Sequence, residues 1–183
     1  MALKIPGYYN YEEDDIEYVE NTYNKVKKVG KGAFSEVFEG INTLNDERVA
    51  IKVLKPIKEK KIRREIKILQ AVKGGPNILE YIATIKDPET ENPAFVTEFI
   101  DMDGMKLRKA KWSFNEEDIR FYMYNILKAL DYANSMGVMH RDVKASNIAI
   151  DHNNRKVYLI DWGLADFYHP GQRYNSNVSS LHF

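Results

Sequence analysis

Residues 138–167, VMHRDVKASNIAIDHNNRKVYLIDWGLADF, place an unusual number of polar side chains between short apolar runs. Asp142 and Asn147 lie five residues apart, Lys144 stands between them, and Asp161 follows the apolar run VYLI. Taken singly, an Asp close to a Gly is typical of a turn, and an Asp and an Asn at this spacing are typical of a capped loop. Carboxylate and amide oxygens are also the ligands that Mg²⁺ prefers, so the segment is a candidate for metal and phosphate chemistry.

The charge of the chain is balanced overall and uneven locally. Its 183 residues have a net charge of zero, but residues 12–20 hold six acids and no base, and residues 47–73 hold ten Lys or Arg against three acids. This split indicates a local anion-binding patch, not general nucleic-acid binding. The chain has no cysteine, which excludes disulfides and thiolate metal sites. No apolar run has the length of a membrane span, and no signal peptide is evident at the start.

The N-terminal half shows the alternating pattern of strands. Two alternating runs, YNKVKKVGKG and AFSEVFEGI, meet at Gly30 and Gly32 and predict a hairpin. Apolar residues at helical spacing predict a helix over residues 60–72. Three further strands are predicted, over residues 47–54, 78–87 and 93–99. This half therefore predicts five strands with one helix inserted after the third.

The second half begins with a helix. Ser113 and Glu116 match the capping-box pattern S-x-x-E, and Gly137 is the expected stop. The predicted apolar face consists of Ile119, Met123, Ile126 or Leu127, Leu130 and Ala133. Short strands are expected over residues 147–151 and 156–161. We divide the chain into an acidic and aromatic N-terminal segment, a mostly β lobe and a mostly α lobe, over residues 1–22, 23–100 and 101–183.

Several residues occur in one order along these elements. Gly30-x-Gly32 lies in the hairpin, Lys52 in the third strand and Glu65 on the helix, and HRDVKASN and DWG follow. Each has a structural interpretation of its own: a hairpin turn with positive φ, a strand lysine facing solvent, an exposed helix carboxylate. Together, each in its expected element, they resemble the signature set of the protein kinases. The resemblance implies an α+β fold of two lobes. The N-terminal lobe would have a five-stranded antiparallel sheet and one helix, and the C-terminal lobe would be mainly α-helical and incomplete.

The resemblance also implies roles for these residues. Lys52 would hold ATP phosphates and pair with Glu65. Asp142 would accept the proton of the substrate hydroxyl, with Lys144 near the transferred phosphate. The expected Mg²⁺ ligands are Asn147 and Asp161. The nucleotide would be bound through Val29, Gly30, Gly32, Ser35, Val37, Ala50, Lys52, Glu98, Ile100, Ala149, Ile160 and Asp161.

Within the protein kinases, the sequence resembles the casein kinase II catalytic (alpha) subunits over nearly its whole length. The shared stretches include GKGAFSEVFEGI, VLKPIKEKKIRREIKIL, GGPNIL and LIDWGLADFYHPGQRYN. This resemblance implies transfer of phosphate from ATP, or from GTP, to Ser or Thr next to acidic residues. The basic helix would recognise those acids through Lys58, Lys60, Lys61, Arg63 and Arg64.

Partners and location are implied in the same way. Besides acidic protein substrates, a regulatory beta subunit would dock on the outer face of the sheet, although Lys25 stands where the family pattern is apolar. The residues that could supply an apolar patch there are Phe38, Ile51, Val53, Ile85 and Val96. Neither nucleic acid nor a membrane is an expected partner, and the expected location is the nucleus and cytoplasm. The aromatic start of residues 8–20 would dock on the activation segment, and we hypothesise that the acids of this stretch compete with acidic substrates for the basic helix.

Two other functions are weighed against this one. The chain ends at Phe183, before the helices that complete a kinase domain, so an inactive nucleotide-binding pseudokinase or an interaction module is the alternative, and we expect the isolated chain to be unstable or weakly active. A small-molecule phosphotransferase is disfavoured by Lys144 and by the basic helix.

Overall fold

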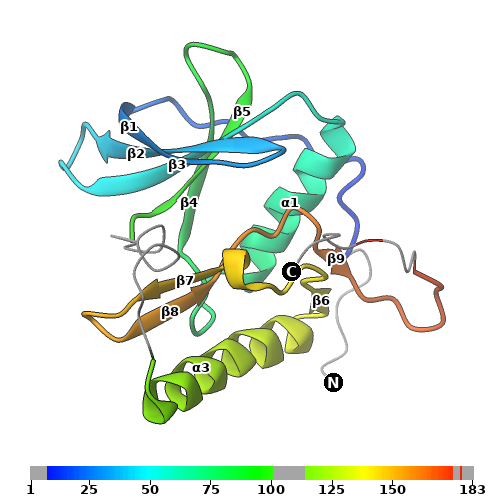
Figure 1. The fold of residues 1–183 in the computed structure, drawn as a ribbon. Coiled ribbons are helices and arrows are strands. Elements are labelled where there is room, and N and C mark those ends of the chain that lie inside the picture. Colours follow the sequence, from blue (N-terminus) through cyan, green and yellow to red (C-terminus); the bar gives the residue numbers. More distant parts are fainter. Residues whose placement is uncertain (1–7, 101–113, 175–177, 179–183) are drawn as a thin grey trace. The chain divides into compact units, whose positions relative to one another are not determined.

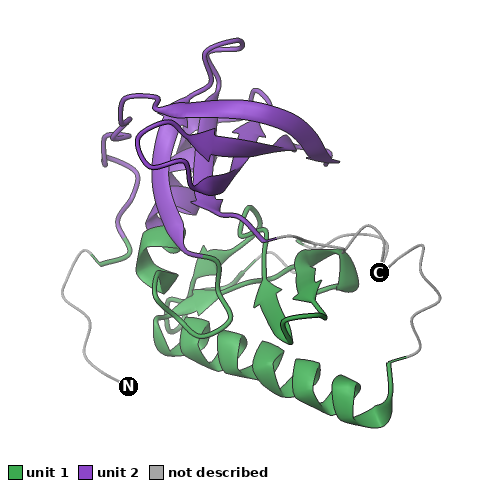
Figure 2. Cartoon of the chain, turned by 90° about the vertical axis from the view of Figure 1, so that its left-hand side faces the viewer, with its two compact units in different colours: residues 1–9, 68–79, 101–183 green, residues 10–67, 80–100 purple. Residues whose placement is uncertain are grey.

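The computed structural model describes residues 8–100, 114–174 and 178, and it has the α+β fold expected from the sequence (Figure 1). By their internal contacts the residues form two compact units (Figure 2). The β-rich unit consists of residues 10–67 and 80–100. The catalytic-loop unit consists of residues 1–9, 68–79 and 101–183. Within the described parts of the chain, no helix combines the length and apolarity needed to span a bilayer.

The β-rich unit contains one five-stranded antiparallel sheet with the strand order β1-β2-β3-β5-β4. All five strands were predicted, with ends that differ by a few residues. The side chains of one sheet face form an apolar core around Val49, Ile51 and Ile85, because alternate residues of a strand point to the same side. The strands are β1 (Tyr23–Lys31), β2 (Ser35–Asn42), β3 (Arg48–Leu54), β4 (Tyr81–Lys86) and β5 (Pro93–Glu98).

Helix α1 (Glu59–Val72) follows β3, as predicted, and contributes residues to both units. Ile62, Leu69 and Val72 of its apolar stripe are buried, and Ile68 is fully buried beside them. The other sides of the helix carry the basic run, so α1 is amphipathic. Each turn of α1 therefore has an apolar side that is buried and a charged side on the surface.

Helix α3 (Glu116–Ser135) begins later than the sequence pattern suggested. Its N-cap is Asn115, whose side chain accepts from the Asp118 N–H while the Asp118 carboxylate accepts from the Asn115 N–H. The capping box is thus N-x-x-D and not the predicted pattern starting at Ser113, which lies outside the described residues. Two overlapping pairs two residues apart satisfied the same rule, and the sequence could not rank them.

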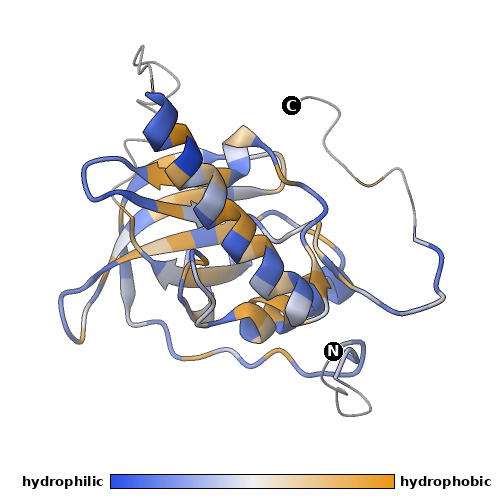
Figure 3. Ribbon diagram, turned by 90° about the horizontal axis from the view of Figure 1, so that it is seen from below, coloured by the Kyte–Doolittle hydropathy of each residue, from blue (hydrophilic) through white to orange (hydrophobic). Residues whose placement is uncertain are grey.

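The buried face of α3 also differs from the prediction. Tyr122, Ile126, Ala129 and Ala133 are buried, whereas three residues of the predicted stripe, Ile119, Met123 and Leu127, have exposed fractions of 50%, 51% and 58%. Viewed from below, α3 alternates between apolar and polar positions along its length (Figure 3). Apolar residues therefore occupy two stripes, and helical periodicity alone could not show which of them packs on Val157 of β8.

Short elements complete the catalytic-loop unit. The strands β7 (Ile148–Asp151) and β8 (Lys156–Leu159) lie where short strands were expected, and they pair with each other. Sequence analysis missed the two-residue strands, which pair with each other, because two residues carry no periodicity. It also missed a single 3₁₀ turn. These elements are β6 (Val138–Met139), β9 (Asp166–Phe167) and η1 (Ala145–Asn147).

The cap of α3 gives a stability prediction. Replacing Asn115 by Ala removes the side-chain acceptor of the capping box, and we expect a loss of about 1 kcal/mol in the free energy of unfolding. The control is Asn134→Ala near the other end of α3, where the exposed side chain makes no cap; it should change stability by less than about 0.5 kcal/mol. Urea denaturation followed by circular dichroism measures both, and equal effects would contradict the assigned cap.

Candidate functional site

The carboxylate of Asp142 is the centre of a buried polar cluster in the catalytic-loop unit. Its Oδ2 accepts hydrogen bonds from Lys144 Nζ and Asn147 Nδ2, each at 2.8 Å. Asn147 Nδ2 also donates to the Asp142 carbonyl oxygen at 2.8 Å. Asp142 and Asn147 are both 5% exposed. The structure therefore joins three of the predicted site residues through one carboxylate, and Lys144 and Asn147 both donate to the same oxygen of it.

Asn147 also connects this cluster to the metal-binding candidate Asp161. The N–H of Ile160 donates to the Asn147 carbonyl oxygen at 2.9 Å, which brings the end of β8 beside the 3₁₀ turn. Asp161 is exposed and its backbone φ is 64°, in the left-handed region that non-glycine residues rarely adopt. Such conformations cluster at functional sites. The chain thus turns sharply where the carboxylate leaves the strand.

The donor set at this point fits Mg²⁺. Asn147 makes both of its side-chain bonds through the amide nitrogen, so its carbonyl oxygen is the atom suited to a cation, and Asp161 adds a carboxylate. The described residues contain no group of three or more His, Cys, Asp or Glu side chains able to hold a metal. Mg²⁺ usually takes one or two protein oxygens together with water and substrate phosphates, so two donors of this kind are an appropriate set.

The two residues before Asp142 have structural contacts. His140 packs edge-on against Trp162 with ring centroids 4.7 Å apart, and its Nε2 lies 3.1 Å from the Ile160 carbonyl oxygen. Burial lowers the pKa of His140, so the neutral ring is favoured at pH 7. Arg141 donates to the Leu164 carbonyl oxygen and pairs with Asp166. His140 therefore packs in the interior of the loop, and Arg141 braces the segment that holds Leu164 and Asp166.

The aromatic start of the chain contacts the same segment. The ring of Tyr9 lies edge-on to Phe167 and His169, with centroids 5.2 and 4.8 Å away. A Cβ on Gly137, whose φ is 73°, would come within 2.8 Å of the Tyr9 hydroxyl oxygen. The expected docking of the N-terminal aromatic residues on the activation segment is therefore present, and Gly137 is required for it.

The β-rich unit contains the predicted Lys–Glu pair. Lys52 Nζ donates to Glu65 Oε1 at 2.8 Å, and Glu65 is only 5% exposed. A buried carboxylate next to apolar neighbours needs such a partner. Glu65 is thus not the exposed helix carboxylate of the structural interpretation, and the Lys52 side chain is directed towards α1 and not into open solvent.

The backbone conformation and packing of the fold do not require glycine at positions 30 and 32. Neither has a positive φ, and a Cβ on either would meet its nearest atoms at 3.5 Å or more, which is ordinary contact. The hairpin turn that needs φ > 0 is therefore excluded as their explanation. Glycine in a strand or hairpin costs about 0.5–1 kcal/mol relative to alanine, so glycine at these positions lowers stability and leaves the backbone without covering side chains.

The strand register places Gly30, Val37 and Ala50 on the same sheet face as Lys52. Val37 lies directly opposite both Gly30 and Lys52, and directly opposed residues share a face. Ala50, two residues before Lys52, belongs to the same face. Val29 lies next to Gly30 in β1, Ser35 begins β2, and Glu98 ends β5 with Ile100 close behind. Ala149 and Ile160 belong to the catalytic-loop unit, where Ala149 is 1% exposed in β7.

Helix α1 contacts the acidic N-terminal segment through its basic residues, a contact that the hypothesis of competition with acidic substrates requires. Lys60 and Arg63 bind residues of the acidic N-terminal segment, and so does Lys67, which the sequence analysis did not select. Lys58 and Lys61 are exposed, and Arg64 is half-buried. Spacing could have identified Lys67, because it lies seven residues after Lys60 and four after Arg63 on the same side of a helix.

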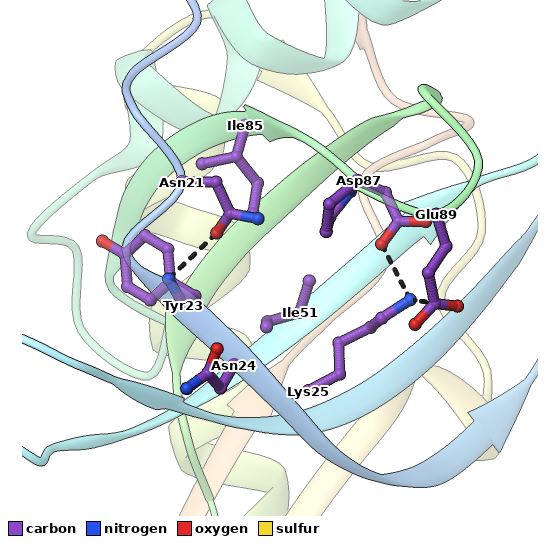
Figure 4. A pocket seen from close by; sticks show the side chains of 9 residues that line it. Asn21, Tyr23, Asn24, Lys25, Ile51, Ile85, Asp87 and Glu89 are labelled. Carbon is purple, nitrogen blue, oxygen red and sulfur yellow. Dashed lines mark hydrogen bonds and ion pairs between the residues drawn. The ribbon is translucent and has the colours of Figure 1, made fainter.

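A pocket of about 260 Å³ opens on the sheet face that carries Ile51 and Ile85, opposite the face that carries Lys52 (Figure 4). Its rim holds Lys25, whose Nζ lies 2.8 Å from Asp87 Oδ1 and 3.0 Å from Glu89 Oε2. Asp87 is 1% exposed and also accepts two hydrogen bonds from Thr90. The pocket is lined by Asn21, Tyr23, Asn24, Lys25, Ile51, Ile85, Asp87, Pro88 and Glu89.

This arrangement corrects the apolar patch predicted for a regulatory subunit. Four of its five residues, Ile51, Val53, Ile85 and Val96, belong to the core and are between 0% and 7% exposed. The fifth, Phe38, is partly buried against them. Strand alternation identifies which residues share a face, but not whether that face is covered. The surface here consists of a charged rim around Lys25, in place of exposed apolar side chains.

The predicted site residues fall into two groups, one in each unit. The β-rich unit holds the glycine hairpin, the Lys52–Glu65 pair and most of the basic helix, and the catalytic-loop unit holds the cluster around Asp142 with Asp161. A comparison with protein-family models matches residues 23–183 to the protein kinase domain. The match spans both groups and begins at the first residue of β1.

The Lys25–Asp87 pair gives a second stability prediction. Replacing Lys25 by Met leaves a buried carboxylate with only its Thr90 partner, and we expect a loss of about 1–3 kcal/mol in the free energy of unfolding at pH 7. The control is Lys27→Met, because the Lys27 side chain is 66% exposed and its partner Glu39 keeps a bond from Arg48; it should cost less than about 1 kcal/mol. Urea denaturation measures both.

The same pair predicts a pH dependence. Burial would raise the pKa of Asp87, but the hydrogen bonds from Lys25 and Thr90 outweigh it and lower the pKa. The stabilisation is therefore complete above the ordinary Asp pKa of about 3.9 and is lost as the pH falls through the lower pKa of the folded state. The stability difference between wild type and Lys25→Met should narrow between pH 7 and about pH 3. A difference that stays constant or widens would refute the assignment.

Proposed function

Because the chain belongs to the protein kinase domain family, we propose that it transfers the γ-phosphoryl group of ATP to Ser or Thr residues that lie next to acidic residues, as casein kinase II does. The family supports protein phosphorylation with Mg²⁺ and ATP in general terms. The choice of Ser or Thr, the acidic substrates and the use of GTP are our proposals, based on sequence resemblance and on the contacts described above.

The observation that carries the proposal is the cluster around Asp142. A buried carboxylate that accepts from a Lys and an Asn on one oxygen is oriented for directional proton acceptance, because its position and its charge are both fixed. We assign to Asp142 the alignment of the substrate hydroxyl and the acceptance of its proton. Lys144, bonded to the same carboxylate, would compensate charge near the transferred group.

The remaining residues bind and orient. Lys52, held by Glu65 at 2.8 Å, would bind phosphate oxygens, and the backbone N–H groups near Gly30 and Gly32 would approach them without side chains in the way. Asn147 and Asp161 would hold Mg²⁺. When bound, Mg²⁺ neutralises charge on the phosphates. Positioning of this kind supplies most of the rate in phosphoryl transfer.

The preference for acidic substrates rests on helix α1. Its Lys60, Arg63 and Lys67 already bind acidic residues or backbone oxygen of the chain's own N-terminal segment. These contacts support the proposal, because the segment they hold is an acidic stretch of polypeptide. A protein substrate with acids next to the target Ser or Thr has the same chemistry.

A kinase assay tests the proposal. The full chain is incubated with Mg·ATP and an acidic Ser peptide, beside the variants Asp142→Asn and Asp131→Asn. Loss of the proton acceptor should lower kcat by about 10²–10⁴-fold, whereas Asp131, exposed on α3, should be replaceable without effect. A kcat for Asp142→Asn close to that of the wild-type chain would refute the assigned role.

The same assay separates the alternative function. Nucleotide binding measured by titration calorimetry, together with no transfer by the wild-type chain, would support an interaction module instead. Replacing the peptide by a neutral isomer tests the acidic preference, since equal kcat/KM for both peptides would contradict it.

A further inference from the structure

The acidic segment and helix α1 contact each other within the β-rich unit. We define the acidic strap as residues 12–15, Glu-Glu-Asp-Asp, and the basic face as Lys60, Arg63 and Lys67. Lys60 Nζ lies 2.5 Å from Glu12 Oε1, and Lys67 Nζ lies 2.9 Å from Asp14 Oδ2. Arg63 Nη1 donates to the Glu12 carbonyl oxygen at 2.6 Å. The hydrogen bond and charge of Glu12 raise the pKa of Lys60.

The three basic residues form one stripe of the helix. They stand at positions i, i+3 and i+7, which lie above one another on an α-helix. The strap crosses this stripe with two side chains, those of Glu12 and Asp14, and with one backbone carbonyl. Its contacts therefore engage the basic face in the way an extended acidic peptide would, using alternate side chains and main-chain oxygen.

The chain is also attached to β4 a few residues after the strap. The Val19 N–H donates to the Thr84 carbonyl oxygen at 3.0 Å, and Lys86 Nζ lies 5.3 Å from the centre of the Tyr18 ring. This attachment to β4 keeps the strap near α1 even when its own contacts are broken. Attachment through the same chain gives the strap a high effective concentration at the basic face.

The ion pairs between the strap and the basic face are solvent-exposed, so another acidic segment could replace the strap in them. The Lys60 and Glu12 side chains are each 61% exposed, and those of Lys67 and Asp14 are 33% and 48% exposed. Exposed ion pairs contribute little net free energy, since water solvates the separated charges well. A second acidic segment can therefore replace the strap without leaving buried charge behind.

We propose that the acidic strap is an intramolecular competitor that occupies the basic face of α1, and that an acidic peptide binds there only after displacing it. This rests on the proposed function, and it adds a regulatory element to the same surface. Because only the open fraction of molecules is competent to bind, the strap raises the apparent dissociation constant for acidic ligands by the reciprocal of that fraction. Weakening the strap should strengthen acidic-peptide binding.

A matched pair of variants tests this. Glu12→Gln with Asp14→Asn removes the two carboxylates that contact the basic face. Glu17→Gln with Glu20→Gln removes two charges from the same segment, where no contact with α1 is recorded, and so changes the net charge equally. A dye-labelled acidic peptide with Ala in place of the acceptor Ser is titrated into each full chain without nucleotide, and binding is followed by fluorescence anisotropy.

We expect the first variant to bind the peptide about three- to tenfold more tightly than wild type, as loss of two exposed pairs allows, and the second to change binding less than about twofold. Equal strengthening in both variants would show only a general charge effect and would overturn the proposal. No change, or weaker binding, in the first variant would overturn it too. Unaltered thermal melts would show that neither variant perturbs the fold.

The readout does not depend on catalysis. If phosphoryl transfer is absent but the first variant still binds the acidic peptide more tightly, the strap proposal stands and the proposed function fails. If transfer occurs with acidic preference and Glu12→Gln with Asp14→Asn has wild-type affinity for the peptide, the proposed function stands and the strap proposal fails.

Discussion

The hydrogen bonds of Asn147 hold the catalytic-loop unit together at its most polar point. Its side-chain nitrogen donates to the backbone carbonyl and the carboxylate of Asp142, and its backbone carbonyl oxygen accepts from the Ile160 N–H. One buried residue thus fixes the loop that carries Asp142, the proposed proton acceptor, relative to the strand end that carries Asp161. A buried polar network of this kind is stable only when its members are satisfied. The geometry of both acidic residues therefore depends on a neutral amide between them.

The β-rich unit has a corresponding constraint in the Lys52–Glu65 pair. It links the middle strand of the sheet to helix α1, so the orientation of Lys52, the proposed phosphate-binding lysine, follows from where the helix packs. The glycines of the hairpin show the opposite principle. The fold would accept side chains at Gly30 and Gly32, and their absence leaves backbone that the proposed phosphate ligand could approach. Fixed charge and exposed backbone would therefore complement each other in the proposed site.

Much of this could be predicted from the sequence, for definite reasons. Strands with alternating apolar residues and a helix with a clear stripe were recovered because their periodicity is strong, as in β3 and α1. The Asp142 cluster was anticipated because its residues are close in the chain. Errors arose where a local rule had two solutions. Two capping pairs overlapped before α3, and two apolar stripes competed for its buried face.

Other features depend on contacts that no local pattern encodes. The pairing of Lys67 with Asp14 joins residues 53 positions apart. The burial of Ile51 and Val96 depends on the other core residues that pack around them on that face of the sheet. The sequence shows that charges of opposite sign are present, but only the fold shows which of them meet. Lys25 is an example. The sequence shows a lysine where the resembled family has an apolar residue, and only the fold shows that it forms ion pairs with Asp87 and Glu89 at the rim of a pocket.

The acidic strap has a consequence for behaviour in solutions of different ionic strength. Salt screens exposed charges over about 8–10 Å under physiological conditions, so it weakens the attraction of the basic face for a substrate and for the strap alike. The two effects oppose each other, since added salt also releases the competitor. A chain with its strap in place would therefore hold its affinity for acidic ligands more nearly constant as salt changes than a bare basic helix could, and the strap would act as a buffer against ionic strength.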